Sequence, residues 1–111
     1  KIIAAEPDTS AVLSGEPSGS HALQGIGAGF VPEILNTKIY DEIIKVSKED
    51  AYSMARDMGT NEGVLIGISS GAALWAAIEI AKREENKDKK IVVLFADSGE
   101  RYLSTDLYNK E

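Results

Sequence analysis

The sequence predicts a layered α/β fold in which helices flank a sheet. Helix-like and strand-like stretches alternate along the second half of the chain, which is typical of α/β layers. Residues 91–96 form a continuous apolar run, as expected of a parallel strand that is covered on both faces. Hydrophobic residues make up 43% of the 111 residues and charged residues 27%, which is ordinary globular composition. We therefore expect one unit over residues 1–111, without an internal domain boundary.

The first half of the chain predicts two short strands separated by irregular structure. Residues 1–5 favour a strand, which Glu6-Pro7 should close because proline cannot donate to a sheet ladder. Residues 8–20 are rich in turn-forming residues, and a glycine-rich segment follows at residues 24–32. Residues 42–46 are the second strand candidate. The chain opens without Met on a strand-like run, which suggests a domain that is entered in the middle.

A first helix is predicted after the second strand. Ser47 and Asp50 have the spacing of a capping box, in which the side chain at the cap satisfies a free backbone N–H. The apolar face recurs with helical periodicity at Ala51, Met54, Ala55 and Met58. We expect this helix to end before Gly63.

A second helix should follow the short apolar run at residues 64–68. It opens at Ser69-Ser70-Gly71 and is apolar on nearly all sides as far as Ile80, so we expect it to be deeply buried. Lys82 and Arg83 lie at its C-terminal end, where positive charge is favourable. Residues 84–90 are predicted to be a charged surface connection.

Composition and charge argue against several classes of function. The net charge is −6, and the basic residues between Lys82 and Lys90 alternate with acidic ones, so nucleic acid is not an expected partner. The absence of cysteine and the single histidine, His21, exclude Cys-based and His-rich metal sites. Glycine, serine and glutamate interrupt the most apolar stretch, residues 64–81, which favours burial in protein over a membrane span. We predict a cytoplasmic protein, because residues 1–5 are also too short for a signal peptide.

Gly-Ile-Ser-Ser-Gly at residues 67–71 has three interpretations. Ser69 could cap the second helix. The letters also match the G-x-S-x-G nucleophile elbow, but no histidine follows Ser69 to act as a base. Alternatively, the Ser69 hydroxyl could meet the ring nitrogen of a cofactor. For pyridoxal phosphate a neutral hydroxyl leaves the ring nitrogen largely unprotonated, which suits β-elimination.

Two further segments are candidate site regions. Gly-Ile-Gly-Ala-Gly-Phe at residues 25–30 does not meet the spacing of a dinucleotide fingerprint. Its glycines either allow close approach to a ligand or simply form a left-handed turn. Asp97 and Ser98 follow the predicted strand at its C-terminal edge, where ligands of open α/β sheets gather. They could support a site, or they could form a turn followed by a structural ion pair between Glu100 and Arg101.

Four segments carry a family resemblance that spans the chain. They are Glu-Pro at 6–7, Gln-Gly-Ile-Gly-Ala-Gly-Phe-Val-Pro at 24–32, Gly-Ile-Ser-Ser-Gly-Ala-Ala at 67–73 and Gly-Glu-Arg-Tyr-Leu-Ser-Thr at 99–105. In this order and spacing they resemble the cysteine synthase (O-acetylserine sulfhydrylase) family of pyridoxal-phosphate-dependent enzymes. Ala96 is a departure, because the family often has proline before the Asp/Ser turn.

The resemblance implies a fold-type II enzyme, of which residues 1–111 form the C-terminal portion of the cofactor-binding large domain. It implies a homodimer that converts O-acetylserine and sulfide to cysteine and acetate by β-replacement on pyridoxal 5'-phosphate. Ser69 would face the pyridine nitrogen of the cofactor. The mouth of the active site, where a serine acetyltransferase partner inserts its C-terminal tail, would be bordered by Gly25, Gly27, Ala28, Gly29 and Phe30.

The resemblance also implies that essential parts of the enzyme lie upstream of the matching region. These are the Schiff-base lysine, the Thr-Ser-Gly-Asn substrate loop and the phosphate-binding loop, and Lys1 stands too early to replace the lysine. We therefore assign no catalytic residue and expect the chain alone to bind the cofactor weakly and to be inactive. The alternatives are a non-catalytic interaction module or a relative similar to cystathionine β-synthase. Unsatisfied apolar surface on the second helix also predicts self-association.

Overall fold

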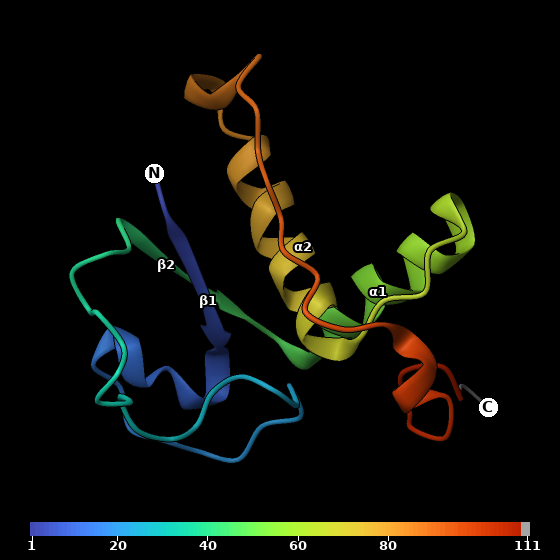
Figure 1. Cartoon of the computed structure of the whole chain (residues 1–111), viewed down its shortest axis with the longest axis horizontal. Coiled ribbons are helices and arrows are strands. Elements are labelled where there is room, and N and C mark those ends of the chain that lie inside the picture. Colours follow the sequence, from blue (N-terminus) through green and yellow to red (C-terminus); the bar gives the residue numbers. More distant parts are fainter. Residues whose placement is uncertain (110–111) are drawn as a thin grey trace.

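The computed structural model describes residues 1–109 and contains two strands and two long helices (Figure 1). Strand β1 (Ile3–Pro7) and strand β2 (Glu42–Val46) form a parallel two-stranded sheet. Helix α1 (Lys48–Glu62) and helix α2 (Ile68–Ala81) follow. Helix α2 packs against both strands on one side and against α1 on the other, so the layers are sheet, α2 and α1. The predicted α/β layering is confirmed.

Both predicted strands are present, and β1 has the expected length of five residues but lies two residues further along the chain than predicted. In the parallel register Ile3 lies opposite Glu42 and Pro7 lies opposite Val46. Pro7 therefore forms the last residue of β1 instead of standing outside it, a position that its missing N–H permits. The bounds of β2 match the prediction.

The turn-rich region after β1 is fastened to the strand by a buried carboxylate. Two short 3₁₀ turns, η1 (Asp8–Ser10) and η2 (Val12–Ser14), follow β1 directly. Glu6 is only 3% exposed, and its carboxylate accepts hydrogen bonds from the backbone N–H groups of Leu13 and Ser14 and from the Ser14 hydroxyl. These three bonds compensate for the burial of the charge.

Helix α1 begins and ends where its capping signals predict. The Ser47 hydroxyl oxygen accepts a hydrogen bond from the Asp50 backbone N–H at 3.1 Å, and it also donates to the Asp50 carboxylate at 2.8 Å. Gly63 closes the helix in the left-handed region at φ +70°, a conformation that glycine adopts without strain. The buried face of α1 comprises Ala51, Tyr52 and Ala55.

Helix α2 is buried on one side only, which corrects the expectation of deep burial all round. Its buried residues are Ile68, Ser70, Gly71, Ala72, Ala76 and Ile80. Leu74, Trp75 and Ile78 are only half-buried. The expectation fails because α1 and the two strands cover only part of the apolar circumference of this helix. The connection at residues 84–90 is a charged, largely exposed segment, as predicted.

The predicted strand at residues 91–96 is wrong within the described part of the chain. This segment, orange in Figure 1, runs beside α2 but joins no ladder. Val92 is 95% exposed and Leu94 81% exposed. The sequence has the apolar character of a covered strand, but a strand also needs a partner edge, and residues 1–109 place none beside it. The apolar run before α2 likewise makes only one bridge, between Ile66 and Ser98.

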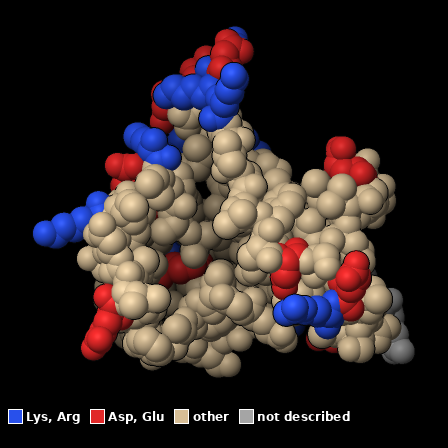
Figure 2. All heavy atoms as spheres, in the orientation of Figure 1, with Lys and Arg blue, Asp and Glu red and all other residues tan. Residues whose placement is uncertain are grey.

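The hydrophobic core lies where α1, α2 and the C-terminal segment, residues 99–109, meet. Its fully buried members include Leu23, Val46, Ala51, Ala55, Ile66, Ile68, Ala72 and Leu107. Figure 2 shows a largely uncharged face, with basic and acidic side chains gathered over the end of α2, and a hollow between the strands and α2. Among the described residues, no helix has the length and apolarity needed to cross a membrane.

Candidate functional site

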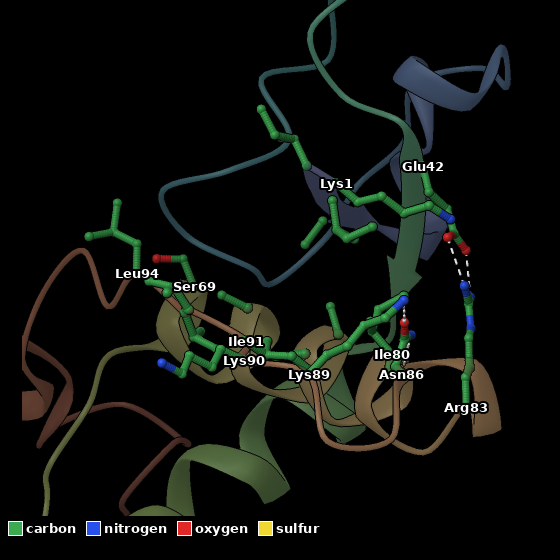
Figure 3. A pocket seen from close by; sticks show the side chains of 18 of the residues that line it. Lys1, Glu42, Ser69, Ile80, Arg83, Asn86, Lys89, Lys90, Ile91 and Leu94 are labelled. Atoms are coloured by element: carbon green, nitrogen blue, oxygen red, sulfur yellow. Dashed lines mark hydrogen bonds and ion pairs between the residues drawn. The ribbon is translucent and has the colours of Figure 1, made fainter.

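A cavity of about 700 Å³ opens between β1 and residues 91–94, with α2 as its floor (Figure 3). Its floor is lined by small and apolar side chains of α2: Ala73, Ala76, Ala77 and Ile80. At one end Arg83 forms an ion pair with Glu42, which lowers the pKa of the Glu42 carboxyl. The other end holds Ser69, next to Leu94 in Figure 3.

Ser69 lies in the first turn of α2 and faces this cavity, but it does not cap the helix. The cap residue is Gly67, and no side chain provides a cap hydrogen bond. The helix-cap interpretation of Ser69 is therefore wrong. Within residues 1–109 no hydrogen bond engages the Ser69 hydroxyl, whereas the neighbouring Ser70 hydroxyl donates to the Asp97 backbone carbonyl at 3.3 Å. Ser69 thus offers an uncommitted polar group beside the apolar α2 floor of the cavity, at the end opposite the Arg83–Glu42 ion pair.

The glycine-rich segment passes directly over the Ser69 hydroxyl. A Cβ atom built on Gly25 would lie 3.6 Å from the Ser69 Oγ, which is ordinary contact distance. Gly25 has φ +99°, and Ile26 contributes its side chain to the same cavity. The backbone of Gly25 and the side chain of Ile26 therefore form a cover over Ser69.

The glycines form left-handed turns, as one of the two interpretations expects, whereas their close approach to a ligand stays a prediction. Gly25, Gly27 and Gly29 all have positive φ, which favours glycine at each position. A Cβ on Gly27 would lie 2.5 Å from the Pro7 ring, so glycine is also required there by space. A second cavity of about 420 Å³ lies under this segment and is lined by all five predicted rim residues, Gly25, Gly27, Ala28, Gly29 and Phe30.

Asp97 and Ser98 lie behind the start of α2 and line neither of these two cavities. The Asp97 carboxylate accepts a 2.5 Å hydrogen bond from the Tyr102 hydroxyl, and this bond raises the pKa of Tyr102. The Asp97 backbone carbonyl accepts from Gly67 N–H at 3.4 Å. Ser98 bridges to Ile66. Both residues thus fix the segment that leads into α2, at Ile66 and Gly67, and do not line the cavity.

The expected ion pair between Glu100 and Arg101 is not formed among the described residues. These two residues instead belong to a 3₁₀ turn, η4 (Gly99–Tyr102). The turn buries Gly99 and Tyr102, so it packs residues 99–102 against the loop that precedes α2.

The nucleophile-elbow interpretation of Ser69 lacks a base. The chain has a single histidine, His21. Both of its ring nitrogens already form hydrogen bonds, one with the Gly27 carbonyl and one with the Leu23 N–H. Ile26, which lines the cavity together with Ser69, was not among the predicted site residues, and neither was His21, which contacts Gly27. The signal for Ile26 was an apolar side chain between two glycines, whereas the contacts of His21 could not be read from the sequence.

The residues of this site fit a flat heteroaromatic cofactor such as pyridoxal phosphate. The cavity supplies an apolar floor from α2 and one free hydroxyl, and the Gly25 backbone lies close to that hydroxyl without a side chain of its own. A neutral hydroxyl can donate a hydrogen bond to an unprotonated ring nitrogen without adding a charge that would protonate it.

Comparison with known proteins agrees with this chemistry. The family model "Pyridoxal-phosphate dependent enzyme" matches residues 1–97. A cysteine synthase of Staphylococcus aureus (strain N315) is 55% identical over 109 residues, which are 98% of this chain and 35% of that protein. The chain thus spans about a third of the length of the curated relatives it matches.

Solved structures show the same similarity. The crystal structure of a cysteine synthase from Entamoeba histolytica superposes with a TM-score of 0.97 at 50% identity, over 100% of this chain and 33% of that one. An O-acetylserine dependent cystathionine β-synthase from Helicobacter pylori gives a TM-score of 0.87 at 34% identity, over 97% of this chain and 35% of that one. Since the family model also matches well over half of its residues, this chain belongs to the family of pyridoxal-phosphate dependent enzymes.

Proposed function

We propose that this chain is the C-terminal part of the cofactor-binding large domain of a cysteine synthase, which makes cysteine and acetate from O-acetylserine and sulfide. The observation that carries the proposal is the free Ser69 hydroxyl, which faces the cavity above the apolar side of α2, beside the Gly25 backbone. Identities of 50–55% to cysteine synthases, against 34% to the cystathionine β-synthase, favour this enzyme over its sibling.

In this proposal Ser69 holds the ring nitrogen of the cofactor by a hydrogen bond. Pyridoxal phosphate, when bound, supplies the electron sink for β-replacement. Because serine is neutral, it leaves the nitrogen unprotonated, whereas a carboxylate at the same place would stabilise a protonated ring. The glycine cover excludes water from one side of the site, and Asp97 supports the start of α2 from behind.

We further propose that the rim around Phe30 is the partner surface of the intact enzyme. Phe30 is 64% exposed at the edge of the second cavity, so an apolar terminus could pack there. This position is compatible with binding of the C-terminal tail of a serine acetyltransferase. The alternative function, a non-catalytic interaction module, would use the same rim. Calorimetry with a peptide that ends in isoleucine tests both, and absence of binding heat argues against them. Homodimerisation and a cytoplasmic location of the intact enzyme remain predictions.

A chimera tests the enzymatic proposal. The matching 109-residue region of the Staphylococcus aureus cysteine synthase is replaced by this chain, and cysteine formation from O-acetylserine and sulfide is measured. We expect an active chimera. Ser69→Ala should lower the rate about tenfold, the effect of one lost hydrogen bond to the cofactor. Ser69→Thr keeps the hydroxyl and should retain most of the activity, and Ser53→Ala, at an exposed position of α1, is the matched control.

The isolated chain should not turn over O-acetylserine. Our expectation is that added pyridoxal phosphate dialyses away, because this chain offers a hydroxyl for the ring but no assigned group for covalent capture. Absorbance of a bound Schiff base that survives dialysis, together with cysteine formation, would contradict this part of the proposal.

A further inference from the structure

His21 is hydrogen-bonded through both ring nitrogens, and one of these bonds determines its tautomer. The backbone N–H of Leu23 lies 3.1 Å from Nδ1 and can only donate, so Nδ1 must be the acceptor. Nε2 lies 2.7 Å from the carbonyl oxygen of Gly27, which can only accept. His21 is therefore a neutral imidazole whose proton is on Nε2, and it donates that proton to Gly27.

The bond from His21 to Gly27 closes the glycine-rich segment into a loop. One side of this loop is fixed by Leu23, which is 1% exposed and belongs to the hydrophobic core. The other side is fixed at Gly27, where a Cβ would lie 2.7 Å from the His21 Nε2 atom. Glycine at this position is what allows the imidazole to reach the carbonyl.

The residues inside the closed loop are the ones that cover Ser69. Gly25 lies close to Ser69, since a Cβ built on it would lie 3.6 Å from the Ser69 Oγ, and Ile26 lines the same cavity. The Ile26 backbone N–H donates to the Leu23 carbonyl at 3.3 Å, so the loop also contains an internal turn. Any change that releases Gly27 would free both residues of the cover.

We propose that His21 is a positioning residue whose Nε2–H holds the Gly27 carbonyl and thereby fixes Gly25 and Ile26 over the Ser69 hydroxyl. The inference rests on the proposed function in one respect only: it takes a cofactor ring as the group that Gly25 and Ile26 enclose beside Ser69. His21 is not among the residues that line the cavity with Ser69, so it acts on the site through the loop. Its role is to hold the cover in place before any ligand binds.

The two nitrogens can be tested separately with a matched pair of variants. In His21→Asn the side-chain oxygen takes the place of Nδ1 and keeps the turn to Leu23, but it has no donor that reaches Gly27. In His21→Gln the amide nitrogen takes the place of Nε2 and keeps the donor to Gly27. His21→Ala removes both bonds.

The measurement is NMR on the 111-residue chain without cofactor. Nitrogen-15 shifts of the unmutated imidazole should show the Nε2–H tautomer. Hydrogen exchange of the Ile26 amide should accelerate about tenfold in His21→Asn and His21→Ala, and should stay near the parent rate in His21→Gln. The different behaviour of Asn and Gln separates loop positioning from a general loss of stability, which urea unfolding of each variant records.

Two results would overturn the inference. One is an Nδ1–H tautomer in the parent chain, a measurement that needs no variant to fold. The other is parent-like exchange of Ile26 in both His21→Asn and His21→Ala. None of these readouts involves a cofactor, so they stand if the Ser69 proposal fails, and the Ser69 tests likewise stand if His21 proves dispensable.

Discussion

Gly67, the cap residue of α2, has a backbone conformation open to any residue but no room for a side chain. A Cβ there would lie 1.9 Å from the Asp97 Oδ1 atom and 2.8 Å from the Tyr102 ring. We predict that Gly67→Ala lowers the free energy of unfolding by about 1–3 kcal/mol, because Asp97 must move out of its bond with Tyr102. Urea denaturation measures this. Gly59→Ala is the control, since a Cβ there would meet its nearest neighbours at 3.9 and 4.0 Å, and it should stabilise by roughly 0.5–1 kcal/mol.

Tyr102 makes the stability of the fold depend on pH in the alkaline range. The hydrogen bond to Asp97 and burial both raise the pKa of Tyr102 above its ordinary value of about 10. The folded state therefore holds the phenol proton more tightly than the unfolded state, so this stabilisation is complete below pH 10 and is lost as the pH rises through the folded pKa. We predict that Tyr102→Phe flattens the fall in urea midpoint above pH 10. Tyr108, whose pKa burial also raises, should leave a residual slope. An unchanged slope in Tyr102→Phe would contradict the assignment.

The caps of α1 make a prediction at the scale of a single element. Ser47→Ala removes the acceptor for the Asp50 N–H and should lower the free energy of unfolding by about 1 kcal/mol. Ser53→Ala, on the exposed face of the same helix, should change it by no more than about 0.5 kcal/mol. Equal losses in the two variants would show that the Ser47 cap does not stabilise the helix.

Elements whose signals are local were predictable from the sequence, and elements that need a partner were not. Ser47 and Gly63 bracket α1 through contacts with their own neighbours, so its bounds were predicted correctly. Residues 91–96 have the composition of a buried strand, but a strand exists only as part of a ladder, and none forms here. The position of Ser69 after an apolar run suggested a cap, yet Gly67 occupies that role because only glycine fits against Asp97.

The candidate site was predictable to the same extent. The family resemblance singled out Ser69 and the glycines, and the closeness of Gly25 to Ser69 gives that hypothesis a geometry. The role of His21 was not predictable, because it depends on which nitrogen carries the proton and on a carbonyl six residues away. The sequence marked His21 only as the single histidine of the chain.

At the scale of the whole molecule, exposed apolar surface predicts self-association. Val92 and Leu94 are largely exposed at the edge of the main cavity, and the adjacent α2 is only half-covered. We expect the sedimentation coefficient of the isolated chain to rise with concentration. Val92→Lys should reduce this rise, because a charge at the edge opposes burial. Ile34→Lys, at another exposed apolar position away from this cavity, should have little effect.

Two results would contradict self-association through the surface around Val92 and Leu94. Strictly monomeric sedimentation at all concentrations, combined with cooperative unfolding, would show that the chain tolerates this surface in water. A rise that Ile34→Lys abolishes and Val92→Lys leaves unchanged would place the contact elsewhere.

The central claim is that the Ser69 hydroxyl meets an uncharged ring nitrogen, and one measurement addresses it directly. Pyridoxal phosphate labelled with nitrogen-15 in the ring is bound to the Staphylococcus aureus chimera, and the chemical shift of that nitrogen is recorded. We predict the shift of an unprotonated pyridine in the parent chimera and a move towards the pyridinium value in Ser69→Asp. A shift that neither Ser69→Asp nor Ser69→Ala alters would contradict the contact.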